Sequence, residues 1–169
     1  MVCVAGQSEG RTQVGFNYLS NPMLVVAQDL IKSGELGDII SFRGIHAEDY
    51  MCGAESFYTW RHDPIGGGVL ADLGSHILAT AEFLLGPISK VLGDCVTVIP
   101  FRKTKNGERR EITVDDISRS YLKFATGVTG SIEASWLATG RKMKHDFEIH
   151  GTLGSIAYSQ ERLNELHFF

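Results

Sequence analysis

Gly66-Gly67-Gly68-Val69-Leu70-Ala71-Asp72-Leu73-Gly74-Ser75-His76-Ile77 opens the longest helix that this sequence predicts. Residues 69–85 are apolar on most of a helical circumference, and Gly86-Pro87 then provides a stop signal. A helix of this kind is covered by protein on most sides. Asp72 and His76 interrupt the apolar pattern. They are four residues apart, so the spacing predicts that both side chains lie on one helical face.

These two side chains form a candidate acid–base group. Histidine is well placed to take or give a proton near neutral pH, and a neighbouring carboxylate can orient the imidazole and favour its charged form. The same spacing also fits an ordinary surface ion pair, worth about 0.2–0.5 kcal/mol. Glycines at 66–68 and 74 favour a site, because glycine lets another backbone or a ligand approach closely. We therefore predict that Asp72 and His76 are catalytic.

The segments around this helix predict the fold class. On its N-terminal side we expect a strand at 13–18, a helix from Ser20-Asn21-Pro22 to Gly34, and a strand at 39–48. On its C-terminal side a charged loop is expected at 102–111, and strands at 91–101, 117–124, 128–138, 145–150, 155–158 and 166–169. Helices first and adjacent strands later are typical of an α+β domain. Its sheet is expected to be open, mainly antiparallel and covered by helices on one face.

Composition excludes several classes of partner. The chain has 169 residues and a net charge of -4, which gives no basic footprint for nucleic acid. No apolar run approaches the roughly 20 residues that span a bilayer, and the first residues lack the pattern of a signal peptide. The cysteines, Cys3, Cys52 and Cys95, are odd in number and have no Cys-x-x-Cys spacing. We therefore expect reduced thiols in a cytoplasmic protein, with neither a membrane nor a nucleic-acid partner.

Trp60-Arg61, in the loop before the glycines, is a candidate substrate-binding pair. An indole face can stack on the C–H groups of a polyol, and a guanidinium can donate to its hydroxyls. A hydrophobic loop anchor with a surface ion pair is the alternative.

Other candidates lie at strand ends. His46, Glu48, Asp49 and Tyr50 end a predicted strand beside the presumed cleft, so we include His46 and Asp49 as substrate-binding residues. Asn17 ends the first predicted strand and is also included, although an asparagine there fits a turn equally well.

No metal is predicted. Cys52, His62 and Asp63 could be grouped with His46, but their spacing fits no zinc pattern. The acidic pair Asp115-Asp116 is expected to be structural, as a turn and a solvated charge.

Six motifs together resemble a known family. In chain order they are Gly15-Phe16-Asn17-Tyr18, Gly34-Glu35-Leu36-Gly37, Trp60-Arg61, the 66–78 stretch, Val114-Asp115-Asp116 and Gly151-Thr152-Leu153-Gly154-Ser155. From about Gln13 onward the chain resembles the C-terminal, substrate-binding half of the glucose–fructose oxidoreductase/inositol dehydrogenase/rhizopine catabolism family, written Gfo/Idh/MocA.

The resemblance implies a function. Such enzymes join a Rossmann domain to an α+β domain whose open sheet forms an oligomer interface. They pass hydride between a secondary alcohol of a sugar or polyol and NAD or NADP. The family's catalytic aspartate and histidine fall on Asp72 and His76. The resemblance thus implies that His76 is the general base and that Asp72 supports it.

The sequence also departs from the family pattern. It has neither a Gly-x-Gly-x-x-Gly fingerprint nor the Glu-Lys-Pro motif that supplies a lysine, and Leu19 stands where arginine is frequent. We therefore expect residues 1–13 to be the end of a nucleotide-binding domain or a linker. Residues 14–169 would be an α+β domain truncated at its C-terminus, with the Rossmann domain absent and this fragment inactive alone.

The predicted function is thus the substrate-binding half of an NAD(P)-dependent sugar or polyol oxidoreductase. Residues 128–138 and 145–150 are interpreted as strands with apolar side chains in both registers, which would suit a homo-oligomer formed through the open sheet. One alternative is a non-catalytic domain that assembles or scaffolds. Another is metal-dependent hydrolysis on Asp72, His76 and His46.

Overall fold

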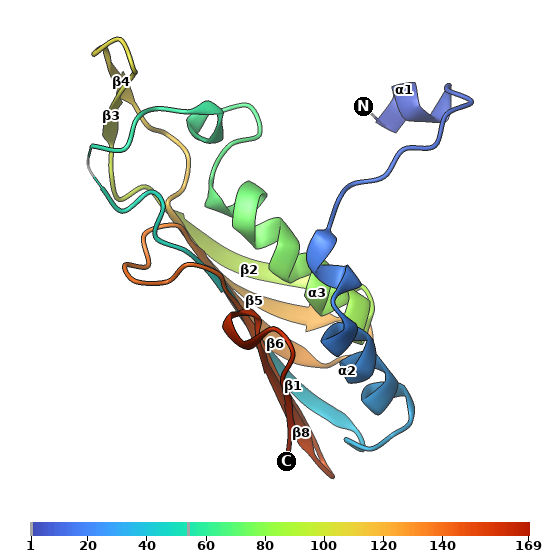
Figure 1. The fold of residues 1–169 in the computed structure, drawn as a ribbon. Helices are drawn as coiled ribbons and strands as arrows, with labels where there is room; N and C mark the ends of the chain where they lie inside the picture. The colour runs from blue at the N-terminus through green and yellow to red at the C-terminus, as the bar shows by residue number, and fades with distance from the viewer. Residues whose placement is uncertain (1, 54) are drawn as a thin grey trace.

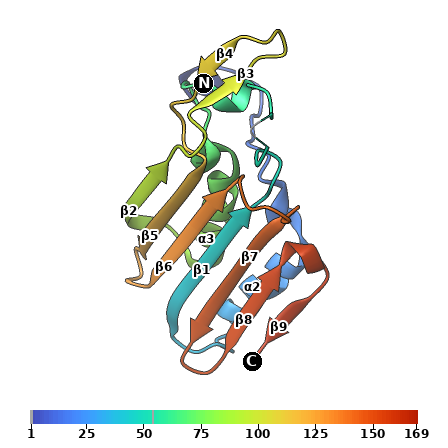
Figure 2. The same ribbon diagram turned by 90° about the vertical axis from the view of Figure 1, so that its left-hand side faces the viewer.

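The structure is a computed structural model that describes residues 2–53 and 55–169. Its centre is a seven-stranded sheet in the order β2-β5-β6-β1-β7-β8-β9 (Figure 2). Only the β1–β6 pair is parallel, so the sheet is mainly antiparallel, as predicted. The strands are β1 (Ile39–Ala47), β2 (Ile88–Val96), β5 (Ile117–Phe124), β6 (Thr129–Ser135), β7 (Lys144–Gly151), β8 (Ser155–Ser159) and β9 (Leu166–Phe168).

Two helices cover one face of this sheet, and the other face is left open (Figure 1). The first, α2 (Pro22–Lys32), begins as predicted: the Asn21 side chain accepts a hydrogen bond from the Met23 backbone N–H, and Pro22 occupies the first turn. The second, α3 (Ser75–Leu85), ends at Gly86, whose φ is 83°. The α+β class with helices on one face is therefore confirmed.

The remaining elements are short. They are α1 (Val2–Gly6), η1 (Asn17–Ser20), η2 (Trp60–His62), η3 (Leu70–Gly74), η4 (Gln160–Arg162), and a separate hairpin of β3 (Phe101–Lys103) and β4 (Arg109–Glu111). No helix among the described residues is long and apolar enough to cross a membrane.

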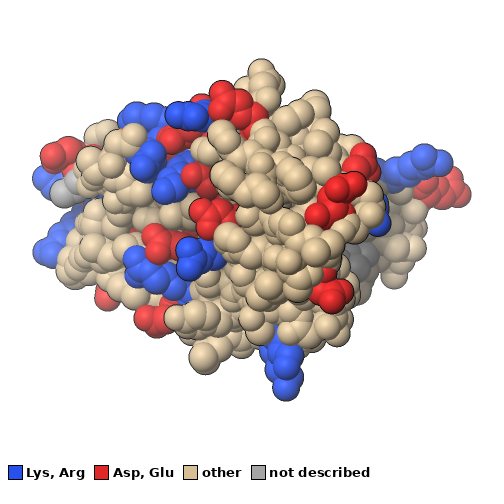
Figure 3. Space-filling view, turned by 90° about the horizontal axis from the view of Figure 1, so that it is seen from below, with Lys and Arg blue, Asp and Glu red and all other residues tan. Residues whose placement is uncertain are grey.

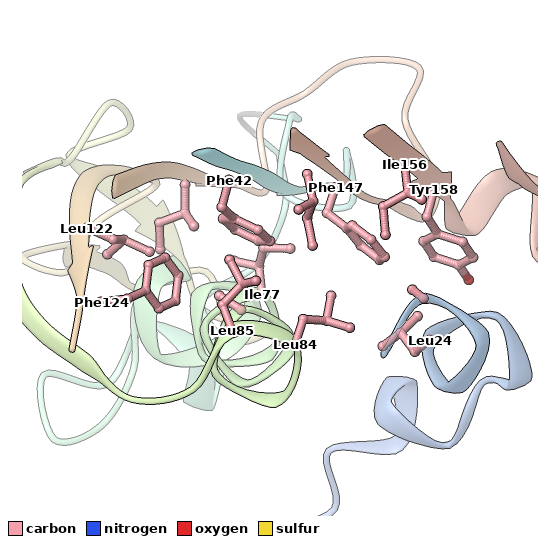
Figure 4. Close-up of a cluster of buried hydrophobic side chains, with 14 of the residues drawn as sticks. Leu24, Phe42, Ile77, Leu84, Leu85, Leu122, Phe124, Phe147, Ile156 and Tyr158 are labelled. Atoms are coloured by element: carbon pink, nitrogen blue, oxygen red, sulfur yellow. The ribbon is translucent and has the colours of Figure 1, made fainter. Parts of the chain in front are cut away.

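The core fills the space between the sheet and the helices (Figure 4). Buried and more exposed residues alternate along β5, β7 and β8. The labelled side chains of this cluster are Leu24, Phe42, Ile77, Leu84, Leu85, Leu122, Phe124, Phe147, Ile156 and Tyr158. Their burial stabilises the packing of the helices on the sheet, because each Å² of apolar surface removed from water contributes about 25 cal/mol of free energy.

Helix α3 approaches β1 closely because of a glycine. A side-chain carbon at Gly44 would lie 2.7 Å from Ile77 Cγ1 and 2.9 Å from Phe42 Cε1. Ile77 is fully buried and follows His76 in the sequence. The Gly44–Ile77 contact therefore sets the height of His76 above the sheet.

The structure differs from two predictions: the strand at 13–18 and the single helix at 69–85. Residues 11–16 form no strand, and 17–20 form the 3-10 helix η1. This segment lies beside α3, where the centroids of the Phe16 and His76 rings are 5.6 Å apart. It packs against a helix and is not part of either sheet. The helix predicted at 69–85 begins with a π-helical turn, η3, before it becomes the α-helix α3.

The region after β2 also differs from the prediction. Strand β2 ends at Val96, because the Val98 and Ile99 N–H groups donate to the Asp116 carboxylate and Pro100 has no N–H. The expected charged loop contains the β3–β4 hairpin instead. Asp116 is fully buried, so its predicted solvated charge is wrong.

The open face carries more polar side chains than the sequence suggested. The outward residues of β6 and β7 include Ser131 and Glu133, and Asp146 and Glu148, so these strands are apolar in one register only. Arg119 pairs with Glu133 at 2.8 Å on this face. In Figure 3 both signs of charge intermingle on the left, the side of the open face.

Candidate active site

A polar cavity of about 420 Å³ lies where the carboxyl end of β1 meets the first turns of the α3 region. Its walls come from η1, β1, the following loop, η2, η3 and α3. The lining residues are Tyr18, His46, Glu48, Tyr50, Arg61, Asp72, Leu73 and His76. The volume falls within the roughly 300–1,000 Å³ of small-molecule sites.

Asp72 is held by two donors on one oxygen. The Tyr50 hydroxyl and the Arg61 Nε–H each donate to Asp72 Oδ2 at 2.7 Å. The Arg61 guanidinium in turn lies 4.4 Å from the centre of the Trp60 ring and 5.5 Å from that of Tyr50. Burial, and then the hydrogen bond to Asp72, raise the pKa of Tyr50, so this hydroxyl remains a donor.

This arrangement changes the role expected for Asp72. Within the described residues, no hydrogen bond joins Asp72 to His76, so the carboxylate does not orient the imidazole by direct contact. Its influence on His76 is electrostatic: the negative charge of Asp72 raises the pKa of the imidazole and opposes the larger effect of burial.

The π turn that carries Asp72 is anchored by Asp115, which lies just before β5. The Leu70 N–H donates to Asp115 Oδ2 at 2.8 Å, and the Val69 N–H donates to the Asp115 carbonyl at 2.9 Å. Gly68 precedes this turn with φ of 99°, a left-handed conformation that favours glycine. π turns often occur at functional sites. Here the turn brings Asp72 to the cavity.

His76 lies half-buried between aromatic rings. Its ring meets Tyr18 edge-on at 4.8 Å and Phe16 edge-on at 5.6 Å. Burial lowers the pKa of His76, with the charge of Asp72 acting in the opposite direction. The imidazole is therefore neutral at neutral pH, which is the form that can accept a proton.

Two further histidines are fully buried: His46, which lines the cavity, and His145, whose ring packs against that of His46. His46 Nδ1 contacts the Leu73 carbonyl at 3.1 Å, and His145 Nε2 contacts Thr80 Oγ1 at 2.9 Å. Burial lowers the pKa of His46 to about 4 and that of His145 to about 3. Both rings are therefore neutral, so they add no positive charge beside His76.

The structure brings four of the predicted site residues together: Asp72, His76, His46 and Arg61 all line the cavity. The other three do not line it. Trp60 is 66% exposed and stacks on Arg61, Asn17 is exposed in η1, and Asp49 binds Lys142 at 2.7 Å and the Gly140 N–H at 3.1 Å.

Tyr18 is the polar lining residue that the sequence did not predict. Its ring contacts His46, His76 and His145 at centroid distances of 5.3, 4.8 and 4.7 Å. The sequence predicts a strand here, and only the 3-10 turn beside α3 reveals the contact. Glu48 and Tyr50, considered because they follow the β1 strand, do line the cavity.

No group of three or more His, Cys, Asp or Glu side chains within residues 2–53 and 55–169 could hold a metal ion. His46, His76 and Asp72 line one cavity but form no such group.

Comparisons with known proteins agree with this fold. The family model of the GFO/IDH/MocA C-terminal domain matches residues 24–157. Levoglucosan dehydrogenase of Pseudarthrobacter phenanthrenivorans is 35% identical over 168 residues, covering 90% of this chain and 43% of that protein. The scyllo-inositol 2-dehydrogenase (NAD(+)) of Bacillus subtilis is 29% identical over 147 residues, covering 85% of this chain and 39% of that protein.

Solved structures extend the comparison. Levoglucosan dehydrogenase in complex with NADH and L-sorbose has a TM-score of 0.89 and 37% identity, covering 92% of this chain and 42% of that one. An NAD binding oxidoreductase from Klebsiella pneumoniae has a TM-score of 0.93 and 33% identity, covering 99% and 45%. The chain spans about two fifths of the length of the curated relatives named above. It belongs to the GFO/IDH/MocA family and corresponds to the C-terminal domain of its members.

Proposed function

We propose that this chain is the substrate-binding and catalytic part of an NAD(P)-dependent oxidoreductase that acts on a secondary alcohol of a sugar or polyol. The observation that carries the proposal is a single cavity in which a neutral imidazole, His76, faces the same space as the fixed carboxylate of Asp72. The names of the relatives, a levoglucosan dehydrogenase and a scyllo-inositol dehydrogenase, support the substrate class.

In this proposal His76 is the general base. Oxidation of a secondary alcohol removes the hydroxyl proton and a hydride from the same carbon, which leaves a ketone. His76 accepts the proton, a step that typically contributes about 10²–10⁴-fold to the rate. Both donors to Asp72 reach Oδ2, and none of the hydrogen bonds of the described residues ends on Oδ1. Oδ1 is therefore the acceptor for a substrate hydroxyl.

The nicotinamide dinucleotide would be bound mainly by a domain outside this chain and would accept the hydride. The glycine run before η3 does not fit a pyrophosphate, because the Asp115 carboxylate already accepts from the Leu70 N–H there. In this proposal the residues of this chain bind the substrate and move its proton, and they do not hold the dinucleotide.

The test is turnover by the protein that joins this chain to a nucleotide-binding domain. Reduction of NAD⁺ and NADP⁺ would be followed with levoglucosan, L-sorbose, scyllo-inositol and myo-inositol as probes. We expect reduction of one dinucleotide with at least one polyol. Dinucleotide binding without turnover of any polyol or sugar would contradict the proposal.

We further propose that the open sheet face pairs with a second copy of the chain. This face is hollowed by a cavity of about 860 Å³. Its exposed apolar side chains include Leu92 and Tyr121, which are opposite each other in the β2–β5 register and are 73% and 71% exposed. Light scattering after gel filtration should give an oligomer. Tyr121→Arg should shift it toward monomer, whereas Leu153→Arg, outside this face, should not. A monomeric parent protein would contradict this part.

A further inference from the structure

One ring nitrogen of His46 is fixed by the backbone. His46 Nδ1 lies 3.1 Å from the Leu73 carbonyl oxygen, which can only accept a hydrogen bond. Nδ1 therefore carries the proton and donates it. In a neutral imidazole the other nitrogen, Nε2, then has a lone pair and is an acceptor.

The nearest partner of Nε2 is an acid. His46 Nε2 lies 3.3 Å from Glu48 Oε1, with the His46 side chain fully buried and that of Glu48 16% exposed. With Glu48 as a carboxylate, two acceptors would face each other. If Glu48 is a carboxylate, His46 Nε2 therefore has no hydrogen-bond partner among the described residues. A buried acceptor without a donor is unfavourable, and a single proton on Oε1 would supply the missing donor.

The charges around Glu48 favour this proton. Burial raises the pKa of Glu48, and the negative charges of Asp72, from η3, and of Asp49, its neighbour, raise it further. Arg61, from η2, lowers it. Arg61 and Asp72 form an ion pair at 2.7 Å, so their opposite effects on Glu48 largely offset each other, and burial is the main cause of the raised pKa.

The remaining groups that face Glu48 are neutral. Tyr18 and Tyr50 have raised pKa values, because of burial in both cases, and so remain protonated. A second proton on His46 is disfavoured: burial lowers its pKa to about 4, and His76 adds to the effect. The proton of the pair therefore belongs on the carboxyl group.

We propose that Glu48 is a positioning residue that carries a proton and donates it to His46 Nε2. The hydrogen-bonded series then runs from Glu48 through the His46 ring to the Leu73 carbonyl, next to Asp72 in the π turn. It ties the end of β1 to the turn that presents the carboxylate. It also leaves Asp72 as the one negative charge of the cavity, balanced by Arg61, which suits an uncharged polyol. The inference rests on the proposed function only for that last consequence.

The test is NMR of the chain without any substrate. Glutamate would be labelled with ¹³C at the side-chain carboxyl and histidine with ¹⁵N, and Glu48→Gln would identify the Glu48 signal by its loss. We expect the Glu48 carboxyl to titrate at a higher pH than glutamate in a short unstructured peptide. His46 should show a protonated Nδ1 and an unprotonated Nε2, and its Nε2 signal should shift with the same midpoint.

Matched variants separate this role from a merely structural one. The side-chain amide introduced by Glu48→Gln can still donate to Nε2, so the His46 tautomer should persist in that variant without the pH-dependent shift. Glu48→Ala should keep the proton on Nδ1, because the Leu73 carbonyl still accepts it, but should lose both the hydrogen bond to Nε2 and the pH-dependent shift of the Nε2 signal. Glu148→Gln, on the open face, should change neither signal.

Two results would overturn the inference: a Glu48 midpoint at or below the peptide value, or a proton on His46 Nε2 in the parent chain. Neither depends on catalysis. A protein that turns over no polyol but shows the shared proton would therefore refute the proposed function and leave this inference standing.

Discussion

At the scale of single residues, the proposed site depends on how hydrogen bonds are divided between the two oxygens of Asp72. Tyr50 and Arg61 both donate to Oδ2, which fixes the rotamer of the carboxylate and keeps its other oxygen available. Arg61, predicted to bind substrate, is engaged with Asp72 and with the faces of Trp60 and Tyr50. Its role in the proposed reaction is therefore to hold the carboxylate.

Tyr50→Phe tests this arrangement. Loss of a hydrogen bond to a charged group costs about 1.5–3 kcal/mol, so kcat/KM for the polyol should fall by about 10- to 150-fold in the protein that carries both domains. Tyr121→Phe, an exposed tyrosine on the open face, is the control and should change kcat/KM little. Equal kcat/KM values for Tyr50→Phe and the parent would show that the hydroxyl does not position Asp72.

The sequence carries part of this site. The spacing of Asp72 and His76 identifies the pair that the structure places in one cavity. The partners of Asp72 could not be predicted, because Tyr50 and Arg61 are 22 and 11 residues away and approach it only through the fold of a loop. Tyr18 was missed for the same reason, since its neighbours His46 and His145 come from two strands of the sheet.

At the scale of elements, two contacts position the cavity walls. One is the close approach of α3 to β1 at Gly44. The other is Arg102, a fully buried guanidinium from β3 that donates to the Met51 carbonyl at 2.8 Å and the Gly53 carbonyl at 3.0 Å. Arg102 thereby fixes the loop that follows Tyr50.

Gly44→Ala should force α3 away from β1. Because the added carbon would lie 2.7 Å from Ile77 Cγ1 in a packed core, we expect a loss of about 1–3 kcal/mol in the free energy of unfolding, measured with urea. Gly15→Ala is the matched control. Nothing lies within 4 Å of a side-chain carbon there, so its effect should stay within about 0.5 kcal/mol. Equal stability of the two variants would contradict the close contact.

Arg102→Met should loosen the loop after Tyr50. It removes the donors to the loop carbonyls and leaves the buried Asp116 without the guanidinium 4.0 Å away, so we expect a loss of about 3 kcal/mol or more in unfolding free energy. Lys103→Met, at the exposed neighbouring position, should change stability by less than about 0.5 kcal/mol. Similar unfolding free energies for the two variants would show that Arg102 does not stabilise the loop.

Most elements could be predicted from the sequence because their signals are local. The cap at Asn21, the alternation in β5 and β6, and the stop at Gly86 each act within a few residues. The predictions that were wrong concern segments whose structure depends on residues distant in the sequence. The Asp116 carboxylate ends the β2 ladder, and Asp115 anchors the π turn at Leu70. Neither contact has a signal in the surrounding sequence.

At the scale of the whole molecule, buried neutral histidines couple stability to pH. The pKa values of His46 and His145 in the folded chain are about 4 and about 3, below the ordinary 6.5. Between these folded values and pH 6.5, the unfolded chain therefore binds more protons than the folded chain. Stability is therefore fully present above pH 6.5 and declines as the pH falls. The raised pKa of Glu48, caused by burial, acts in the opposite direction and reduces the slope.

We expect the free energy of unfolding to fall by about 2 kcal/mol for each of the two histidines between pH 6.5 and 5, before the opposing carboxyl effect. Urea unfolding at several pH values measures this. His150→Gln, an exposed histidine of β7, should keep the slope of the parent. A stability that stays constant or rises on acidification would contradict the neutral buried rings.

The most direct test of the central claim, that His76 removes the substrate proton, is the steady-state kinetics of His76→Ala. The variant would be made in the protein that joins this chain to a nucleotide-binding domain. Loss of the general base should lower kcat by about 10²–10⁴-fold and change KM far less. Turnover equal to that of the parent would show that His76 is not the base.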